Sequence, residues 1–167
     1  MTDVSGALKN PGSSFAFSEA LEFEPCEIMG DVLRFEDAAL SGLLFGAEET
    51  VSIDAELNVT VRAHCARCLE EVACPMRVQV KADFSRAPGE DEYPIAGHLI
   101  DAGKAAFDEL LTQLHMRFLC KEDCLGLCPV CGSNRNKSLC TCLEGAVRPN
   151  PFSALNVLLH DQNNKEV

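Results

Sequence analysis

Aromatic side chains are scarce in this chain of 167 residues, which has no tryptophan and a single tyrosine. Proteins that bind single-stranded nucleic acid usually stack the bases on such side chains, so the sequence disfavours this mode of binding. Apolar runs are also short. None reaches the roughly 18 residues of a membrane span, and we expect no membrane partner. The first residues, MTDVSGALKNPG, lack a basic region followed by an apolar one, so we expect no signal peptide and a cytoplasmic protein.

Basic residues are few, with 14 lysines and arginines against 26 acidic residues and a formal net charge of −12. The imbalance is uneven along the chain. Residues 1–59 and 83–110 are strongly acidic, whereas residues 60–82 carry more basic than acidic side chains. Bare nucleic acid repels an acidic protein, so this distribution suits a basic protein partner, or RNA approached through one local basic face. The simpler alternative is that the acidic residues keep the protein soluble.

Cysteine, by contrast, is abundant, and eight of the ten cysteines form four close pairs: Cys65 and Cys68, Cys120 and Cys124, Cys128 and Cys131, and Cys140 and Cys142. The segment Cys128-Pro-Val-Cys131-Gly132 has the form of a zinc knuckle, in which a tight turn directs two sulfurs inward and the glycine lets the backbone pass behind the metal. Thiolates at this density repel one another unless a cation neutralises them. A metal is therefore the first interpretation.

Three other uses of these cysteines are open. A disulfide framework is typical of small secreted domains, which this N-terminus does not suggest. A redox-active Cys-x-x-Cys needs a thiolate at a helix N-terminus, usually after a strand of a βαβ unit, and neither motif of this kind has that setting. An iron–sulfur cluster also takes four thiolates, although the separated pairs favour zinc.

Eight thiolates suffice for two closed tetrahedral zinc sites. The local solution joins Cys128 and Cys131 to Cys140 and Cys142, and leaves Cys120 and Cys124 to reach back to Cys65 and Cys68. A second possibility joins the 120/124 pair to the 128/131 pair, and a third has one zinc with spare thiols. We expect Cys26 and Cys74 to be core or surface residues, and His64 to support a metal ligand rather than bind the metal.

A catalytic centre is not expected from this sequence. Zinc held by four sulfurs has no open position for a water molecule, which metal-assisted hydrolysis requires. The chain also lacks a glycine-rich phosphate loop, a nucleophilic serine elbow and a His-Glu zinc motif. We therefore predict no catalytic and no organic cofactor-binding residues.

The fold class that the pattern predicts is α+β, with an antiparallel sheet or a partly open barrel. The segments LEFEPCEI, DVLRFED and ALSGLLFG are predicted to be short strands, with breaks at Gly30-Asp31 and Asp37-Ala38. Residues 51–63 and 78–84 alternate between apolar and polar residues, which predicts a long hairpin with Cys65 and Cys68 at its tip. Pro75 then lies at a bulge or a sheet edge.

The remaining elements complete the expected organisation. Asp101 is a predicted N-cap for a packed helix that runs to about Met116, and Asn150-Pro151 is predicted to open a short last helix. Residues 86–97 are predicted to form an acidic, mobile loop. We expect a loose N-terminal arm over residues 1–14, a β-rich domain with one helix over 15–116, and a cysteine-rich segment over 117–167 whose terminal helix packs back on the same domain.

Four features within residues 60–160 resemble the YceD family, the bacterial large ribosomal RNA subunit accumulation proteins. They are the strand that ends in Cys65-Ala-Arg-Cys68-Leu69, the Ile100-Asp101 helix start, the segment LCKEDCLGLCPVCGSNRNKSLCTC, and the ending Asn150-Pro151-Phe152 followed by Ala154-Leu155. A Cys-x-x-Cys alone is weak, but the order of these features is specific. The N-terminal third of the chain shows no such resemblance.

The resemblance implies a non-enzymatic role in ribosome biogenesis, in which the protein supports accumulation of 23S ribosomal RNA. It also implies that the zinc is structural, because only some family members have the full cysteine set. The expected partner is the large-subunit precursor, reached through a basic ribosomal or RNA-associated protein, with a local RNA contact near Arg67, Arg135 and Lys137. Two alternatives stay open: an RNA-processing or thiol redox enzyme, and a generic zinc-stabilised protein adaptor.

Overall fold

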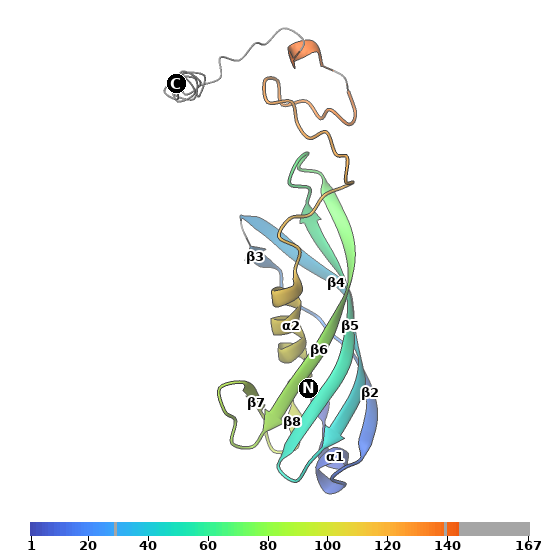
Figure 1. Cartoon of the computed structure of the whole chain (residues 1–167), viewed down its shortest axis with the longest axis vertical. Helices are drawn as coiled ribbons and strands as arrows, with labels where there is room; N and C mark the ends of the chain where they lie inside the picture. Colours follow the sequence, from blue (N-terminus) through green and yellow to red (C-terminus); the bar gives the residue numbers. More distant parts are fainter. Residues whose placement is uncertain (29, 139, 144–167) are drawn as a thin grey trace, which may run out of the picture. The chain divides into compact units, whose positions relative to one another are not determined.

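The computed structural model describes residues 1–28, 30–138 and 140–143, and these fold mainly as β-sheet with two α-helices (Figure 1). The main sheet has six strands in the order β2-β4-β5-β6-β7, with β3 also paired to β4. Its strands are β2 (Ser14–Ala20), β3 (Cys26–Ile28), β4 (Asp31–Gly46), β5 (Thr50–His64), β6 (Glu71–Ser85) and β7 (Glu92–Pro94). The predicted α+β class is confirmed, and the sheet is open rather than closed into a barrel.

The chain divides into two compact units, residues 1–124 and 125–167, which are described separately below. The expected boundary fell eight residues earlier, after Met116. The difference arises because the segment that carries Cys120 and Cys124 belongs with the sheet. The predicted last helix, opened by Asn150-Pro151, lies outside the described residues.

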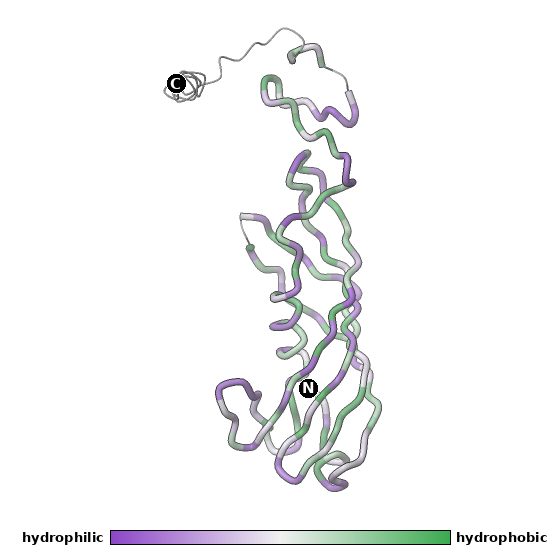
Figure 2. Tube along the Cα trace, in the orientation of Figure 1, coloured by the Kyte–Doolittle hydropathy of each residue, from purple (hydrophilic) through white to green (hydrophobic). Residues whose placement is uncertain are grey.

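The long hairpin expected from the alternation is β5 paired with β6 over their whole lengths, from Thr50 opposite Ser85 to His64 opposite Glu71. Figure 2 shows the apolar and polar residues alternating along both strands. One side of β5 is buried throughout, and its members share an exposed fraction of 4% or less: Val51, Ile53, Ala55, Leu57, Val59, Val61 and Ala63. Pro75 pairs with Thr60 on β5, and β7 reaches β6 only at residues 83–85. Pro75 therefore lies at a sheet edge, where its missing N–H leaves no ladder bond unmade.

The two strands expected on either side of Asp37-Ala38 are instead the single strand β4. Its pairing with β5 shifts register between Glu36 and Ala39, and Asp37 has a positive φ of 53°. These are the features of a β-bulge, which takes up extra residues without ending the strand. The polar Asp37 that signals a turn in the sequence thus marks a bulge in the structure.

The N-terminal residues are ordered against the sheet and are not a loose arm. β1 (Thr2–Asp3) pairs with β8 (Leu99–Ile100), and α1 (Ser5–Lys9) follows it. Val4 and Ala7 are 1% and 2% exposed and belong to the core. Two buried apolar side chains within a polar, glycine-containing segment give too weak a pattern for a sequence-based prediction.

The predicted helix is α2 (Ala102–Gln113), which lies along one face of the sheet (Figure 1). Asp101 caps it as expected, since its carboxylate accepts a hydrogen bond of 3.0 Å from the backbone N–H of Lys104. Ala106 and Leu110 are buried in the core. The helix ends three residues before the predicted Met116, because the backbone of Leu114 is already extended.

Residues 86–97 contain the short strand β7, which runs parallel to the end of β6. Tyr93 of β7 contacts α2, where its hydroxyl donates a hydrogen bond of 3.0 Å to Asp108. Lys104 contacts the same carboxylate at 3.0 Å and lies 5.3 Å from the centre of the Tyr93 ring. These interactions attach the acidic segment to the helix at this point.

Candidate metal centres

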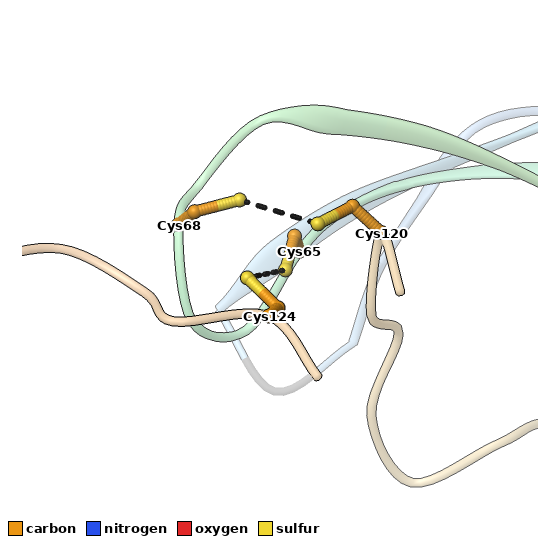
Figure 3. Close-up of side chains that lie close together, drawn as sticks. All are labelled: Cys65, Cys68, Cys120 and Cys124. Atoms are coloured by element: carbon orange, nitrogen blue, oxygen red, sulfur yellow. Dashed lines mark hydrogen bonds between the residues drawn. The ribbon is translucent and has the colours of Figure 1, made fainter. Parts of the chain in front are cut away.

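The first cysteine group lies at the turn between β5 and β6. Cys65 and Cys68 come from this turn, and Cys120 and Cys124 come from the segment that follows α2 (Figure 3). The sulfur of Cys65 is 3.8 Å from that of Cys124, and the sulfur of Cys68 is 3.6 Å from that of Cys120. All four sulfurs lie within 4.8 Å of one another, and three of the four residues are buried. The structure thus joins pairs more than fifty residues apart in the sequence.

The donor set of this group fits a tetrahedral metal ion. Four thiolates at ~2.3 Å from a zinc ion are about 3.8 Å from each other, which is close to the separations seen here. All ten cysteines are free thiols, so no disulfide competes for these sulfurs. Four sulfurs could hold one metal ion of a thiophilic kind, and zinc and iron both belong to this class.

Ala66 and Arg67, which lie between Cys65 and Cys68, form hydrogen bonds to the segment that carries Cys120 and Cys124. The N–H of Ala66 donates to the carbonyl oxygen of Phe118 at 2.9 Å. Arg67 lies between the two cysteines of the turn, and its Nη1 donates to the carbonyl oxygens of Glu122 and Cys124 at 3.0 and 2.9 Å. The Cys-x-x-Cys turn therefore has two roles. Its cysteines supply two sulfurs, and the residues between them bind the segment that supplies the other two.

The second cysteine group belongs to the second unit and contains Cys128, Cys131, Cys140 and Cys142. Their sulfurs also lie within 4.8 Å of one another, and Cys142 is part of a 3₁₀ turn, η1 (Thr141–Leu143). Leu127 and Asn134, on either side of the turn that carries Cys128 and Cys131, form a β-bridge. The structure thus forms the two groups that we expected from the local pairing of the cysteines. The alternative of 120/124 with 128/131 is not what it shows.

The two Cys-x-x-Cys turns have the same backbone hydrogen bonds. In the first, Cys65 donates its N–H to the carbonyl of Glu70 at 2.8 Å, and Leu69 donates to the carbonyl of Cys65 at 2.9 Å. In the second, the matching bonds join Cys128 to Ser133 at 2.8 Å and Gly132 to Cys128 at 2.9 Å. Each turn also places the residue after its second cysteine at positive φ. The value is 61° for Leu69 and 71° for Gly132.

Leu69 is unusual, because a leucine occupies the positive-φ position that is glycine in the second turn. Glycine adopts a positive φ without strain, whereas a side chain with a Cβ does so at a cost of about 1–2 kcal/mol. The leucine is also 63% exposed, so burial does not offset the strain. The sequence signal that could have revealed the match is that Leu69 and Gly132 both directly follow a Cys-x-x-Cys.

Opposing effects set the acidity of the thiols. Burial acts to raise the pKa of Cys65, but hydrogen bonds from the backbone of Arg67, Cys120 and Cys68 lower it to about 6. The hydroxyl and backbone of Ser133 lower the pKa of Cys131, also to about 6. Each group thus contains a thiol that the surrounding protein already favours as a thiolate, which is the form that binds metal.

The other predicted residues have local roles. His64 contacts Asp31 through its ring at 2.7 Å, while its backbone N–H donates to the same carboxylate. Cys26 and Cys74 are half-buried and pack against the core, as expected. Arg135 and Lys137 lie in the second unit, where both donate backbone hydrogen bonds within the cysteine loop.

Comparison with known proteins finds mycobacterial relatives. The chain is 26% identical over 141 residues to two mycobacterial proteins described as uncharacterized, Mb2951c of Mycobacterium bovis and Rv2926c of Mycobacterium tuberculosis. The match covers 78% of this chain and 68% of each relative. No solved structure matches the chain. No helix in the described part of the chain is long and apolar enough to cross a bilayer.

A family profile matches residues 53–159, nearly two thirds of the chain, and this range contains both cysteine groups. The chain belongs to the YceD family, described as the large ribosomal RNA subunit accumulation proteins.

Proposed function

We propose that this protein is a non-enzymatic factor in biogenesis of the large ribosomal subunit, which supports accumulation of 23S ribosomal RNA. The observation that carries the proposal is the family match over residues 53–159. The two four-cysteine groups would each hold one structural zinc ion. In this proposal the protein binds precursor particles through protein contacts, and its metal stabilises the binding surface.

The chemistry of the donor sets supports structural rather than catalytic zinc. A zinc ion with four thiolate ligands has no position left for water or substrate. What it supplies is stability, because the segment from Cys120 to Cys142 contains few apolar residues that could form a core. Structural zinc contributes on the order of 10 kcal/mol to the folding of small peptides, which is enough to order such a segment.

The charge of the first unit supports a basic protein as the direct partner. Residues 1–124 contain more than twice as many acidic as basic side chains. Several of the basic ones are already engaged: Arg62 with Glu36 at 2.9 Å, Arg34 with Glu71, and Arg67 with backbone carbonyls. Within the locally basic stretch over residues 60–82, Arg62 and Arg67 are thus engaged inside the protein, so the stretch has less free positive charge for RNA phosphate than its sequence suggests. A basic ribosomal protein suits the acidic remainder.

The test is a cross-linked pull-down of the tagged protein from growing bacteria that produce it, with RNA and protein identified together. The proposal expects large-subunit precursor RNA and at least one basic ribosomal protein, with the protein contact resistant to nuclease. Incubation of the protein with purified precursor RNA tests the alternative that it is an RNA-processing enzyme. Cleavage that is lost on changing one titratable residue would establish an enzyme. Capture of no large-subunit component would overturn the proposal.

A further inference from the structure

An apolar cleft of about 640 Å³ lies next to the first cysteine group, within the first unit. Its walls come from three places: β3 with the start of β4, the turn that carries Cys65, and the end of α2 with the residues after it. Most of the lining is aliphatic or aromatic, and the apolar members are Ile28, Leu33, Ala66, Leu69, Leu111, Leu114, Met116 and Phe118. Such a lining matches the interior of a protein–protein contact more closely than a solvated surface.

Three of these apolar side chains are left open to solvent. Met116 is 78% exposed, Leu69 is 63% exposed and Leu111 is 37% exposed. Leu69 also has the positive φ that the equivalent turn assigns to glycine. The Cys-x-x-Cys turn accounts for the positive φ at this position, but not for an exposed leucine there. Strain of this kind is typical of positions held for a function.

The strands that line the cleft are already paired. Ile28 is opposite Asp31, Leu33 is opposite Cys26, and His64 is opposite Glu71. β3 is only three residues long, so it offers an incoming strand few backbone hydrogen bonds. The apolar lining favours recognition through side chains, as when an amphipathic helix places its apolar face in a groove. The flexible side chains of leucine and methionine adapt well to such a guest.

The charge around the cleft indicates which class of partner it would bind. The cleft is part of the strongly acidic first unit, and acidic residues lie next to its lining along the chain: Glu27 precedes Ile28, and Glu70 follows Leu69. Within the lining, Asp31 contacts His64, and Arg117 is a basic member. A basic segment would be attracted by the field of the whole unit and opposed near Arg117, while Arg67, which follows Ala66, donates to two backbone carbonyls of the protein itself.

We propose that this cleft binds a basic amphipathic helix of a protein partner, whose apolar face contacts Leu69, Leu111 and Met116. The inference rests on the proposed function only in identifying the partner with a basic ribosomal protein. The cleft and its chemical preference stand on the geometry and charge of this chain.

The experiment uses the full-length, metal-loaded protein and two synthetic helical peptides of about 20 residues, a length that sustains a helix. One is composed of leucine and lysine and the other of leucine and glutamate, with the same apolar face. Binding is followed by fluorescence anisotropy of labelled peptide. The variants are Leu69→Asn, which removes the apolar group and tolerates positive φ, and Met116→Gln, which keeps the side-chain length. Leu43→Gln is the matched control, because Leu43 is 41% exposed near the opposite end of β4.

The leucine–lysine peptide should bind, and both cleft variants should weaken it by about tenfold, which corresponds to loss of one well-buried apolar side chain. Leu43→Gln should leave the affinity unchanged. Arg117→Gln should strengthen binding of the basic peptide, because it removes the repelling charge. Preference for the leucine–glutamate peptide, or equal weakening by Leu43→Gln, would overturn the inference.

The same variants distinguish this inference from the proposed function. If wild-type protein captures large-subunit precursors and Met116→Gln captures them equally well, the cleft is not the docking site, while the proposed function is retained. If wild-type protein captures no precursor but binds the basic peptide at the cleft, the proposed function fails and the cleft inference stands.

Discussion

The guanidinium group of Arg67 donates a hydrogen bond of 2.9 Å to the carbonyl oxygen of Cys124. Arg67 comes from the turn that holds Cys65 and Cys68, so this bond crosses between the two halves of the first cysteine group. A second hydrogen bond, from the same nitrogen to the carbonyl oxygen of Glu122, holds the same segment two residues before Cys124. The arginine also places a positive charge beside four thiolates, whose zinc complex would have a net charge of about −2. Both effects favour the arrangement in which the four sulfurs meet.

Changing Arg67 to Gln is expected to lower the metal affinity of the first group by about tenfold, because hydrogen bonds to a charged group contribute about 1.5–3 kcal/mol and this one is partly exposed. The measurement is competition with a chromophoric chelator on otherwise identical protein. Arg77→Gln serves as the control, since Arg77 lies within β6, six residues after the strand begins. Equal effects of the two changes would mean that Arg67 acts only through general charge.

Leu69→Gly should stabilise the folded protein by roughly 0.5–1 kcal/mol. The change removes the strain of a side chain at positive φ, and the greater entropy of glycine in the unfolded chain offsets part of the gain. Gly132→Ala in the equivalent turn should destabilise by a similar amount. Both values come from denaturant unfolding of metal-loaded protein. A destabilised Leu69→Gly variant would show that the leucine has packing that the structure does not contain.

Tyr93 provides a direct optical test of the contact between β7 and α2, since the chain has one tyrosine and no tryptophan. Burial, and then the hydrogen bond to Asp108, raise the pKa of Tyr93 to about 12 from an ordinary value of 10.0. Because the folded-state pKa is raised, the stability that Tyr93 contributes is full below pH 10 and is lost as the pH rises through 12. Ultraviolet titration of the phenol should therefore have its midpoint near 12, and Asp108→Asn should move it toward 10. A midpoint at 10 in the wild-type protein would mean that β7 is detached from the helix.

Gly42 tests the register of the central strands. It lies opposite Ala55, and a Cβ at position 42 would be 2.5 Å from the Cβ of Ala55 and closer still to the carbonyl oxygen of Asp54. Gly42→Ala should therefore destabilise the protein by about 1–3 kcal/mol, as overpacking does in a sheet that cannot shift. Ser41→Ala is the matched control, because its side chain is on the exposed face of β4. A neutral Gly42→Ala would indicate a different pairing of β4 with β5.

The elements that could be predicted from the sequence are those with a strong local pattern. Alternation of apolar and polar residues over 51–63 predicted the buried face of β5, and Asp101 as an N-cap predicted the start of α2. The spacing of the cysteines indicated the two observed groups as one of three possible arrangements, and the structure has this one. In each case the physical requirement acts within a few residues, or within one tetrahedral site.

Other features depend on contacts that the sequence does not encode locally. Val4 and Ala7 become core residues only because β1 meets β8, nearly a hundred residues away. Asp37 looks like a turn residue, and only its pairing partner on β5 makes it a bulge. Arg67 was expected to contact RNA as part of a basic stretch. Its two carbonyl acceptors, more than fifty residues distant, show that it is engaged within the protein.

Each four-cysteine group is predicted to hold one metal ion, and native mass spectrometry combined with elemental analysis counts these ions. Protein purified without chelator should contain two zinc ions per chain, one for each set of four thiolates. Cys65→Ser and Cys128→Ser should each retain one ion, and the double variant should retain none. Folded wild-type protein that contains no metal, or a single variant that loses both ions together, would show that the two groups are not independent metal sites.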